Sequence, residues 1–358
     1  MKFGFDRLHP IEQVPEKTPE SVEWKGVEKE KVRKYSSRTR LSFFRHGDKA
    51  KPAEGQTADS VLLSEKGRGE AVAASNPETN VRQSIAFGST KPRAEQTAAF
   101  KMAGSEDAIT GDETLDELKA KFDAALAQEA VDAGVVSQEA LDNGFELNGK
   151  KTGVDSRLDF ALDMKGEYGT AMVKSIGEKR YLSFLIEQSD ALAEQLGNTT
   201  DSRYSDFVSN IAEVLVKYAK VEKNWDQLVA QDAFRVASGK ESKGYTETLE
   251  RFFGSHQGIG ESFLAKLIET TKGVEERNAF VESLGNVGFG DVEGFTVDIM
   301  TVPGEDEPVV NIAFTKEYVK ADGTASTFVF NEDVPLQTIA GFVKEKKEVA
   351  VEKADRAV

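Results

Sequence analysis

The stretch that decides the fold is LSFFRHG at residues 41–47, a short apolar run that ends in Arg45, His46 and Gly47. Such a run predicts a buried strand that leads into a loop. In an open α/β sheet, ligands gather where strands end. A neutral imidazole attacks phosphorus well when a hydrogen bond fixes its other ring nitrogen. Arg45 adds a planar fork of donors suited to phosphate oxygens, so this strand end is a candidate phosphate site.

The pattern of strand, loop and helix recurs along the chain. Residues 60–76 (SVLLSEKGRGEAVAASN) predict a loop and a helix with Ser64 as its cap. Residues 84–100 (SIAFGSTKPRAEQTAAF) and 247–260 (ETLERFFGSHQGIG) each place a short apolar run before a polar loop and a helix. Alternating strands and helices are typical of a parallel sheet covered by helices. We therefore expect a three-layer α/β/α fold with a mostly parallel sheet.

The remaining segments set the expected domain organisation. Residues 294–302, 308–319 and 326–331 predict three strands, the last two joined by KADGT at 320–324, where Asp-Gly indicates a hairpin. Residues 105–240 are rich in Ala, Glu, Lys and Leu at helical spacing and predict a large helical insertion or cap. We expect an N-terminal arm at 1–37, an α/β core at 38–104 and 241–335, and a charged C-terminal tail at 336–358.

Composition excludes several classes of protein. The formal net charge of −16 argues against a nucleic-acid binder. The absence of cysteine excludes thiolate sites, and a multi-histidine metal site would need nearly all of His9, His46 and His256. We therefore expect no metal and no cofactor, and assign His9 no role. No apolar run reaches the roughly 20 residues that cross a bilayer, and the N-terminus lacks a secretory signal. We expect a cytoplasmic protein that binds no membrane; the oligomeric state stays unknown.

Four segments, in order along the chain, carry a resemblance to a known family. A strand ending in Arg-His-Gly, a Leu-Ser-x-x-Gly loop, a Ser-x-x-x-Arg-Ala-x-Gln-Thr-Ala helix start and a strand ending in Ser-His are the pattern of the histidine phosphatase (phosphoglycerate mutase-like) superfamily, and this chain resembles its mutase-like branch. The matching residues are Arg45, His46, Gly47, Leu63, Ser64, Gly67, Ser89, Arg93, Ala94, Gln96, Thr97, Ala98, Ser255 and His256.

The resemblance implies a phosphate pocket formed by Arg45, His46, Arg93 and His256. His46 would be the nucleophile that is transiently phosphorylated, and the other three would hold the phosphoryl oxygens during transfer. Lys49 stands where the phytase branch has a second arginine of its pocket. It is a candidate substrate contact, although a solvated loop lysine fits the sequence equally well.

The leaving group also needs an acid. In the mutase-like branch this acid is a glutamate in a Leu-x-Glu stretch, which points to Glu117, with Asp112, Glu113 and Asp116 as alternatives. The acid phosphatase branch uses an aspartate after the second histidine, but Gln257 stands at that position.

The predicted activity is metal-independent hydrolysis of a small phosphomonoester, with a phosphopeptide also compatible as substrate. A phosphomutase with the same pocket, or a non-catalytic protein that binds a phosphorylated ligand, remain the alternatives. Family membership fixes the chemistry more firmly than the specificity, so the sequence does not name the substrate.

Overall fold

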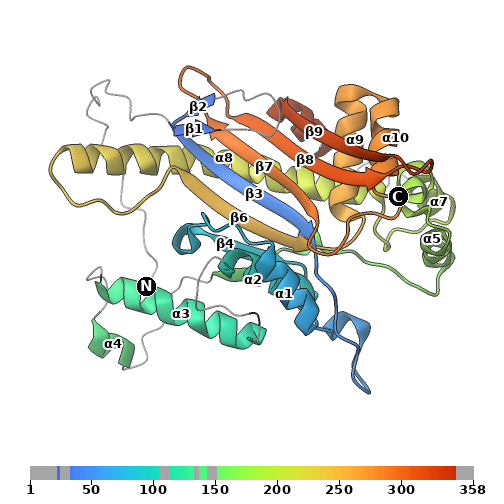
Figure 1. Cartoon of the computed structure of the whole chain (residues 1–358), viewed down its shortest axis with the longest axis horizontal. Helices are drawn as coiled ribbons and strands as arrows, with labels where there is room; N and C mark the ends of the chain where they lie inside the picture. Colours follow the sequence, from blue (N-terminus) through green and yellow to red (C-terminus); the bar gives the residue numbers. More distant parts are fainter. Residues whose placement is uncertain are drawn as a thin grey trace, which may run out of the picture.

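The computed structural model describes residues 22–24, 33–104, 111, 113–132, 137–142 and 151–343 (Figure 1). Its main sheet has seven strands in the order β5-β4-β6-β3-β7-β8-β9, and β1 and β2 form a separate antiparallel pair. The strands are β1 (Val22–Trp24), β2 (Arg33–Tyr35), β3 (Ser37–Arg45), β4 (Ile85–Gly88), β5 (Thr152–Val154), β6 (Thr248–Ser255), β7 (Gly294–Thr301), β8 (Val309–Val319) and β9 (Ala325–Val334).

The main sheet is mixed, which corrects the expectation of a mostly parallel one. Parallel pairs join β3 to β6, β6 to β4 and β4 to β5, whereas β3–β7, β7–β8 and β8–β9 are antiparallel. The β7–β8 and β8–β9 pairs are antiparallel because a short connection reverses the strand direction. Strand β7 follows β6 after residues 256–293 and also runs antiparallel to β3. Residues 320–324 form the predicted connection between β8 and β9.

The register of the central pair brings the predicted motifs together. Arg45 on β3 is the partner of Ser255 on β6, so His46 and His256 leave the sheet at the same edge. The backbone N–H of His46 donates to the carbonyl oxygen of Ser255 at 2.9 Å. The two histidines are therefore neighbours because of strand pairing between segments that are distant in sequence.

Ten helices are named among the described residues: α1 (Glu65–Ala73), α2 (Pro92–Ala103), α3 (Leu115–Asp132), α4 (Gln138–Asp142), α5 (Glu167–Gly177), α6 (Tyr181–Phe184), α7 (Asp190–Gln195), α8 (Tyr204–Ala237), α9 (Ile259–Lys272) and α10 (Val274–Ser283). Residues 336–343 are also helical. No helix in the described part of the chain is long and apolar enough to cross a membrane.

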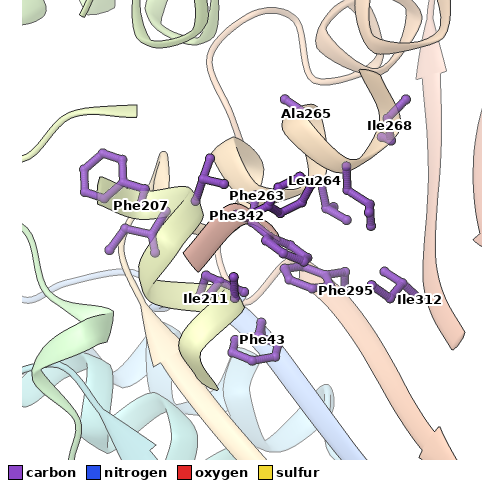
Figure 2. Packing of buried hydrophobic residues seen from close by; sticks show 14 of the residues in the cluster. Phe43, Phe207, Ile211, Phe263, Leu264, Ala265, Ile268, Phe295, Ile312 and Phe342 are labelled. Atoms are coloured by element: carbon purple, nitrogen blue, oxygen red, sulfur yellow. The ribbon is translucent and has the colours of Figure 1, made fainter. Parts of the chain in front are cut away.

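Two apolar clusters lie on opposite faces of the sheet. Neighbouring side chains of a strand point to opposite sides, and Phe43 belongs to the larger cluster while Phe44 belongs to the smaller one. The larger cluster includes residues of α8, α9 and the C-terminal helix, and the smaller one includes residues of α1, α2 and α3. Figure 2 shows Phe263 of α9 beside Phe295 of β7, whose rings stack 6.0 Å apart. Phe295 also stacks on Phe43 at 5.1 Å.

Two parts of the chain differ from the expected domain plan. Strand β5 lies inside the segment expected to be helical and joins the main sheet as its edge. At the other end, the expected charged tail begins with a helix whose Ile339 and Phe342 are buried in the larger cluster. Three residues are too few for a strand to be read from β5. The docked helix was missed because the charged residues from 344 onward dominate the composition of the tail. Residues 344–358 and most of the N-terminal arm lie outside the described residues.

Candidate active site

A cavity of about 390 Å³ opens where β3 and β6 end, and it contains the four residues of the predicted phosphate pocket. Its polar wall and its apolar wall come from different parts of the chain. The lining residues are Arg45, His46, Gly47, Asp48, Lys49, Arg93, Phe160, Leu162, Met164, Met172, Val173, Ile176, Tyr181, His256, Gln257 and Asp291.

His46 has a defined tautomer. Its Nδ1 lies 2.8 Å from the carbonyl oxygen of Gly47, which can only accept, so Nδ1 carries the proton. Its Nε2 then keeps a lone pair, and Nε–H of Arg93 donates to it at 3.1 Å. Burial, assisted by the nearby guanidinium of Arg93, lowers the pKa of His46 to about 4. The imidazole is therefore neutral near pH 7, with Nε2 as its nucleophilic atom.

Arg93 is placed by the start of α2. Pro92 occupies the first turn of that helix, where its missing N–H costs no hydrogen bond. Besides its contact with His46, Arg93 donates from Nη1 to the carbonyl oxygen of Ala58 at 3.2 Å, and it is buried. A Cβ added at Gly254 on β6 would lie 2.1 Å from the carbonyl oxygen of Ala94. Helix α2 thus packs directly on β6, which fixes the position of the arginine.

His256 lies next to His46, with their ring centres 5.2 Å apart in an edge-to-face arrangement. Its Nε2 is 2.7 Å from Oγ of Ser89, while its buried Nδ1 has no hydrogen-bond partner among the described residues. Burial, together with the neighbouring His46, lowers the pKa of His256, so this ring is also neutral. A buried ring nitrogen without a partner beside the nucleophile is available to a phosphoryl oxygen.

Arg45 lies between the site and the loop before β7. Its Nη1 donates to the carbonyl oxygen of Phe289 at 2.8 Å, and its Nη2 lies 3.5 Å from Oδ1 of Asp291. Glu261 holds the same loop, because its carboxylate accepts N–H groups of Phe289 at 2.7 Å and Gly258 at 2.9 Å. Glu261 is fully buried, and sequence reasoning missed it because a glutamate in the first turn of a helix normally indicates only a cap.

The other motif residues hold the loop that follows His46. The Oγ1 of Thr97 accepts the N–H of Gly47 at 3.1 Å, and Oε1 of Gln96 accepts the N–H of Leu63 at 2.9 Å. Ser64 caps α1 as predicted, by accepting the N–H of Gly67 at 3.0 Å. Ser64 also donates to Oδ2 of Asp48 at 2.6 Å.

The structure places Lys49 at the cavity and Glu117 away from it. Lys49 is exposed and lines the cavity. Glu117 is exposed at the start of α3, where its carboxylate accepts the N–H of Thr114 at 2.7 Å and its own N–H donates to Oγ1 of Thr114. That backbone bond holds the pKa of Glu117 below its usual range, whereas an acid catalyst needs a raised one. The assignment of Glu117 as the acid is therefore corrected.

Two alternatives to Glu117, namely Glu113 and Asp116, do not line the cavity either. Glu113 is buried and accepts from Lys121 at 2.7 Å, and Asp116 is exposed on α3. Asp112 lies outside the described residues. Among the described residues, the carboxylates that line the cavity are Asp48 and Asp291.

Sequence reasoning also missed the apolar wall of the cavity. It comes from residues 160–164, α5 and Tyr181. Helix α5 is amphipathic, and from sequence its apolar residues are those of any core-facing stripe. Among the described residues, no group of three or more His, Asp or Glu side chains is arranged to hold a metal ion.

No protein-family model matches the chain, and no curated protein matches it. Several solved structures are similar. A structure called mycobacterial hydrolase 2 shares 15% identity, with 85% of this chain and 97% of that chain covered and a TM-score of 0.37. The mycobacterial glucosyl-3-phosphoglycerate phosphatase shares 17% identity over 73% and 91% of the two chains, with a TM-score of 0.35.

Phosphoglycerate mutase from Bacillus anthracis shares 13% identity over 86% of this chain and 97% of its own, with a TM-score of 0.35. All three TM-scores are below 0.4, so the function is argued from the residues of the cavity. These three structures are named as a hydrolase, a phosphatase and a mutase.

Proposed function

We propose that the protein is a phosphatase that hydrolyses a small phosphomonoester through a phosphohistidine on His46, without a metal ion. One observation carries this proposal: His46 is neutral with its proton on Nδ1, and its Nε2 faces the guanidinium of Arg93. A neutral imidazole with its proton on Nδ1 can attack phosphorus through Nε2 once the substrate has taken over the N–H group of Arg93. Arg45 and His256 lie at the same cavity and add donors for the phosphoryl oxygens.

The reaction has two steps. In the first, Nε2 of His46 forms a bond to phosphorus while the bond from phosphorus to the ester oxygen breaks, and the departing alcohol takes a proton from a carboxyl group. In the second, the oxygen of a water molecule bonds to phosphorus while the bond from phosphorus to Nε2 of His46 breaks, one water proton passes to that carboxylate, and inorganic phosphate leaves. Throughout, Nδ1–H of His46 stays on the carbonyl oxygen of Gly47, and Arg45 and Arg93 balance the negative charge.

The proton donor in this scheme is one of the two carboxyl groups that line the cavity, Asp48 or Asp291. A substitution of the donor should impair esters of poor leaving groups, such as ethyl phosphate, far more than p-nitrophenyl phosphate, whose phenolate leaves without a proton. Asp48→Asn and Asp291→Asn are therefore compared with the wild type on both esters. Glu117→Gln is the matched control and should keep the wild-type ratio of the two rates. If neither aspartate variant changes that ratio, both assignments are wrong.

Access of water favours hydrolysis over mutase activity. Lining residues on the outer part of the cavity are exposed, with Met164 at 59% and Ile176 at 47% exposure. A mutase must return the phosphoryl group to its substrate before water intercepts the phosphohistidine, which requires a shielded site. The open cavity supports hydrolysis.

The first experiment measures phosphate release from p-nitrophenyl phosphate and a panel of phosphorylated metabolites in the presence of EDTA. We expect the wild type to release inorganic phosphate and His46→Ala to be inactive. His9→Ala is the matched histidine control and should retain wild-type turnover. A rapidly quenched reaction should contain an acid-labile phosphoryl group on the wild type alone. Full turnover by His46→Ala would disprove the mechanism, and an isomeric phosphate ester as product would identify a mutase instead.

A further inference from the structure

The cavity has an apolar wall that the phosphoryl chemistry does not use. This wall is formed by the segment after β5, by one side of α5 and by the start of α6. The residues are Phe160, Leu162, Met164, Met172, Val173, Ile176 and Tyr181. Flexible methionine side chains in such a wall adapt to ligands of differing shape.

The outer part of the wall is exposed to solvent. Met164, Ile176 and Val173 are 59%, 47% and 40% exposed, and they are among the few large apolar side chains that the described residues leave open. Met172 and Ile176 are four residues apart on α5, so they lie on one side of the helix. Exposed apolar side chains that line a cavity together are typical of a ligand-binding surface.

The inner part of the wall reaches the phosphate-binding residues. The ring of Phe160 meets the ring of His256 edge-on, with centres 5.1 Å apart. Lys91 also contacts this residue, because its Nζ lies 3.8 Å from the ring centre and donates to the carbonyl oxygen of Phe160 at 3.2 Å. A phosphoryl group at His46 therefore has an apolar surface next to it, where the leaving group would extend.

The charges around the cavity disfavour a second anionic group on the substrate. Apart from Arg45 and Arg93, which serve the phosphoryl group, Lys49 is the one cationic side chain that the described residues contribute to the lining. Asp48 and Asp291 line the same cavity. One of these two groups is the protonated acid of the proposed reaction, and the other is an anion that repels a carboxylate or a second phosphate. With a single exposed lysine as cationic partner, phosphoglycerates and bisphosphates therefore fit poorly.

From this arrangement we infer that the substrate is a monophosphate ester of an apolar alcohol, whose hydrocarbon part lies along the wall from Phe160 to Ile176. This inference rests on the proposed phosphatase function. It adds the class of leaving group, which the four sequence motifs do not specify.

A series of n-alkyl phosphates from ethyl to octyl tests the inference, because their alcohols have similar acidity and differ in apolar length. We expect kcat/KM to rise by up to about fourfold for each added methylene until the wall is covered. Glycerol 3-phosphate and 3-phosphoglycerate should fall below propyl phosphate. The same kcat/KM for every alkyl chain length, or a preference for 3-phosphoglycerate, would overturn the inference.

Substitutions in the apolar wall test whether the dependence on chain length arises there. Ile176→Ser and Val173→Ser should each lower the ratio of kcat/KM for octyl phosphate to that for ethyl phosphate, by up to about tenfold. Val236→Ser is the matched control, since Val236 is 52% exposed on α8 and does not line the cavity, and it should keep the wild-type ratio. An unchanged ratio in both wall variants would refute the binding mode.

The failure of the inference and the failure of the phosphatase function give different results. Turnover that depends on His46 but ignores chain length refutes the apolar leaving group and leaves the phosphatase intact. Absence of His46-dependent turnover for every ester refutes the phosphatase function, and the inference falls with it.

Discussion

The Nε–H of Arg93 donates a hydrogen bond to Nε2 of His46 at 3.1 Å, so the guanidinium occupies the lone pair that would attack phosphorus. A phosphate ester that enters the cavity must take over this N–H group before His46 can react. In the proposed mechanism, Arg93 therefore donates to Nε2 of His46 before a substrate binds and to a phosphate oxygen afterwards. Both tasks need the directed N–H groups of a guanidinium, which an ammonium group does not provide.

Arg93→Lys tests this dual task. The lysine keeps the positive charge but loses the fork of donors, and we expect kcat/KM to fall roughly 10²- to 10³-fold. Steady-state kinetics with p-nitrophenyl phosphate measures the effect. Arg277→Lys on α10, where Arg277 pairs with Glu269 outside the cavity, is the matched control and should behave as wild type. Retention of activity within about threefold in Arg93→Lys would show that only the charge matters.

The protonation of His46 can be followed directly. The chain has three histidines, so the imidazole NMR signals of a histidine-labelled sample are few, and His46→Ala assigns one of them. Because burial lowers the pKa of His46 to about 4, its signal should stay that of a neutral ring from pH 8 down to about 5. It should then shift as the pH falls through about 4. A midpoint near the ordinary value of 6.5 would contradict the proposed state of the nucleophile.

Gly254→Ala tests how α2 is positioned. The added Cβ would lie 2.1 Å from the carbonyl oxygen of Ala94, which is backbone and cannot rotate away. We expect a loss of about 1–3 kcal/mol in the free energy of unfolding, and a larger loss of activity because Arg93 shifts with the helix. Urea denaturation and kinetics measure the two effects. Gly69→Ala in α1 meets nothing within 4 Å and should be neutral or stabilising by up to about 1 kcal/mol.

Glu261→Gln tests the carboxylate that accepts N–H groups from two loops, at Gly258 after His256 and at Phe289 before β7. An amide can accept only one of the two N–H groups that the carboxylate accepts, so we expect a loss of roughly 1–3 kcal/mol in stability. Weaker inhibition by inorganic phosphate should follow, because the Phe289 carbonyl holds Arg45. Glu275→Gln, at an exposed position on α10, is the control. Equal phosphate inhibition in Glu261→Gln and wild type would mean that the loop does not position Arg45.

The pH dependence of stability gives a second measurement on Glu261. Burial raises its pKa to about 7 from the ordinary value of 4.5. A raised pKa in the folded state contributes stability that is fully present below pH 4.5 and is lost as the pH rises through 7. The wild type should therefore lose stability between pH 5 and 8 more steeply than Glu261→Gln. Parallel curves in urea denaturation would contradict this.

The strand ends could be predicted from sequence, and so could the meeting of His46, Arg93 and His256. Each lies beside a short apolar run or a helix start, and both patterns depend only on residues that are close together in the sequence. Strand direction could not be predicted in the same way, because the apolar composition of β7 and β8 does not depend on the orientation of their neighbours. Glu117 was misread because Leu115-Asp116-Glu117 fits the Leu-x-Glu stretch of the family, whereas Thr114 and Glu117 form a capping box at an exposed helix start. The wall on α5 was missed because an apolar stripe looks the same whether it faces a core or a cavity.

The pairing of β3 with β6 also has a consequence for biosynthesis. Strand β3 is made early and β6 late, and most of the described helices are translated between them. Closing so long a loop is entropically costly, so this pairing belongs to the slow part of folding. A nascent chain that still lacks β6 contains His46 but not His256. It also lacks Ser255, whose backbone carbonyl accepts the N–H of His46 in the folded protein. Such a chain cannot form the proposed phosphate pocket, which is complete only after the ribosome has synthesised β6.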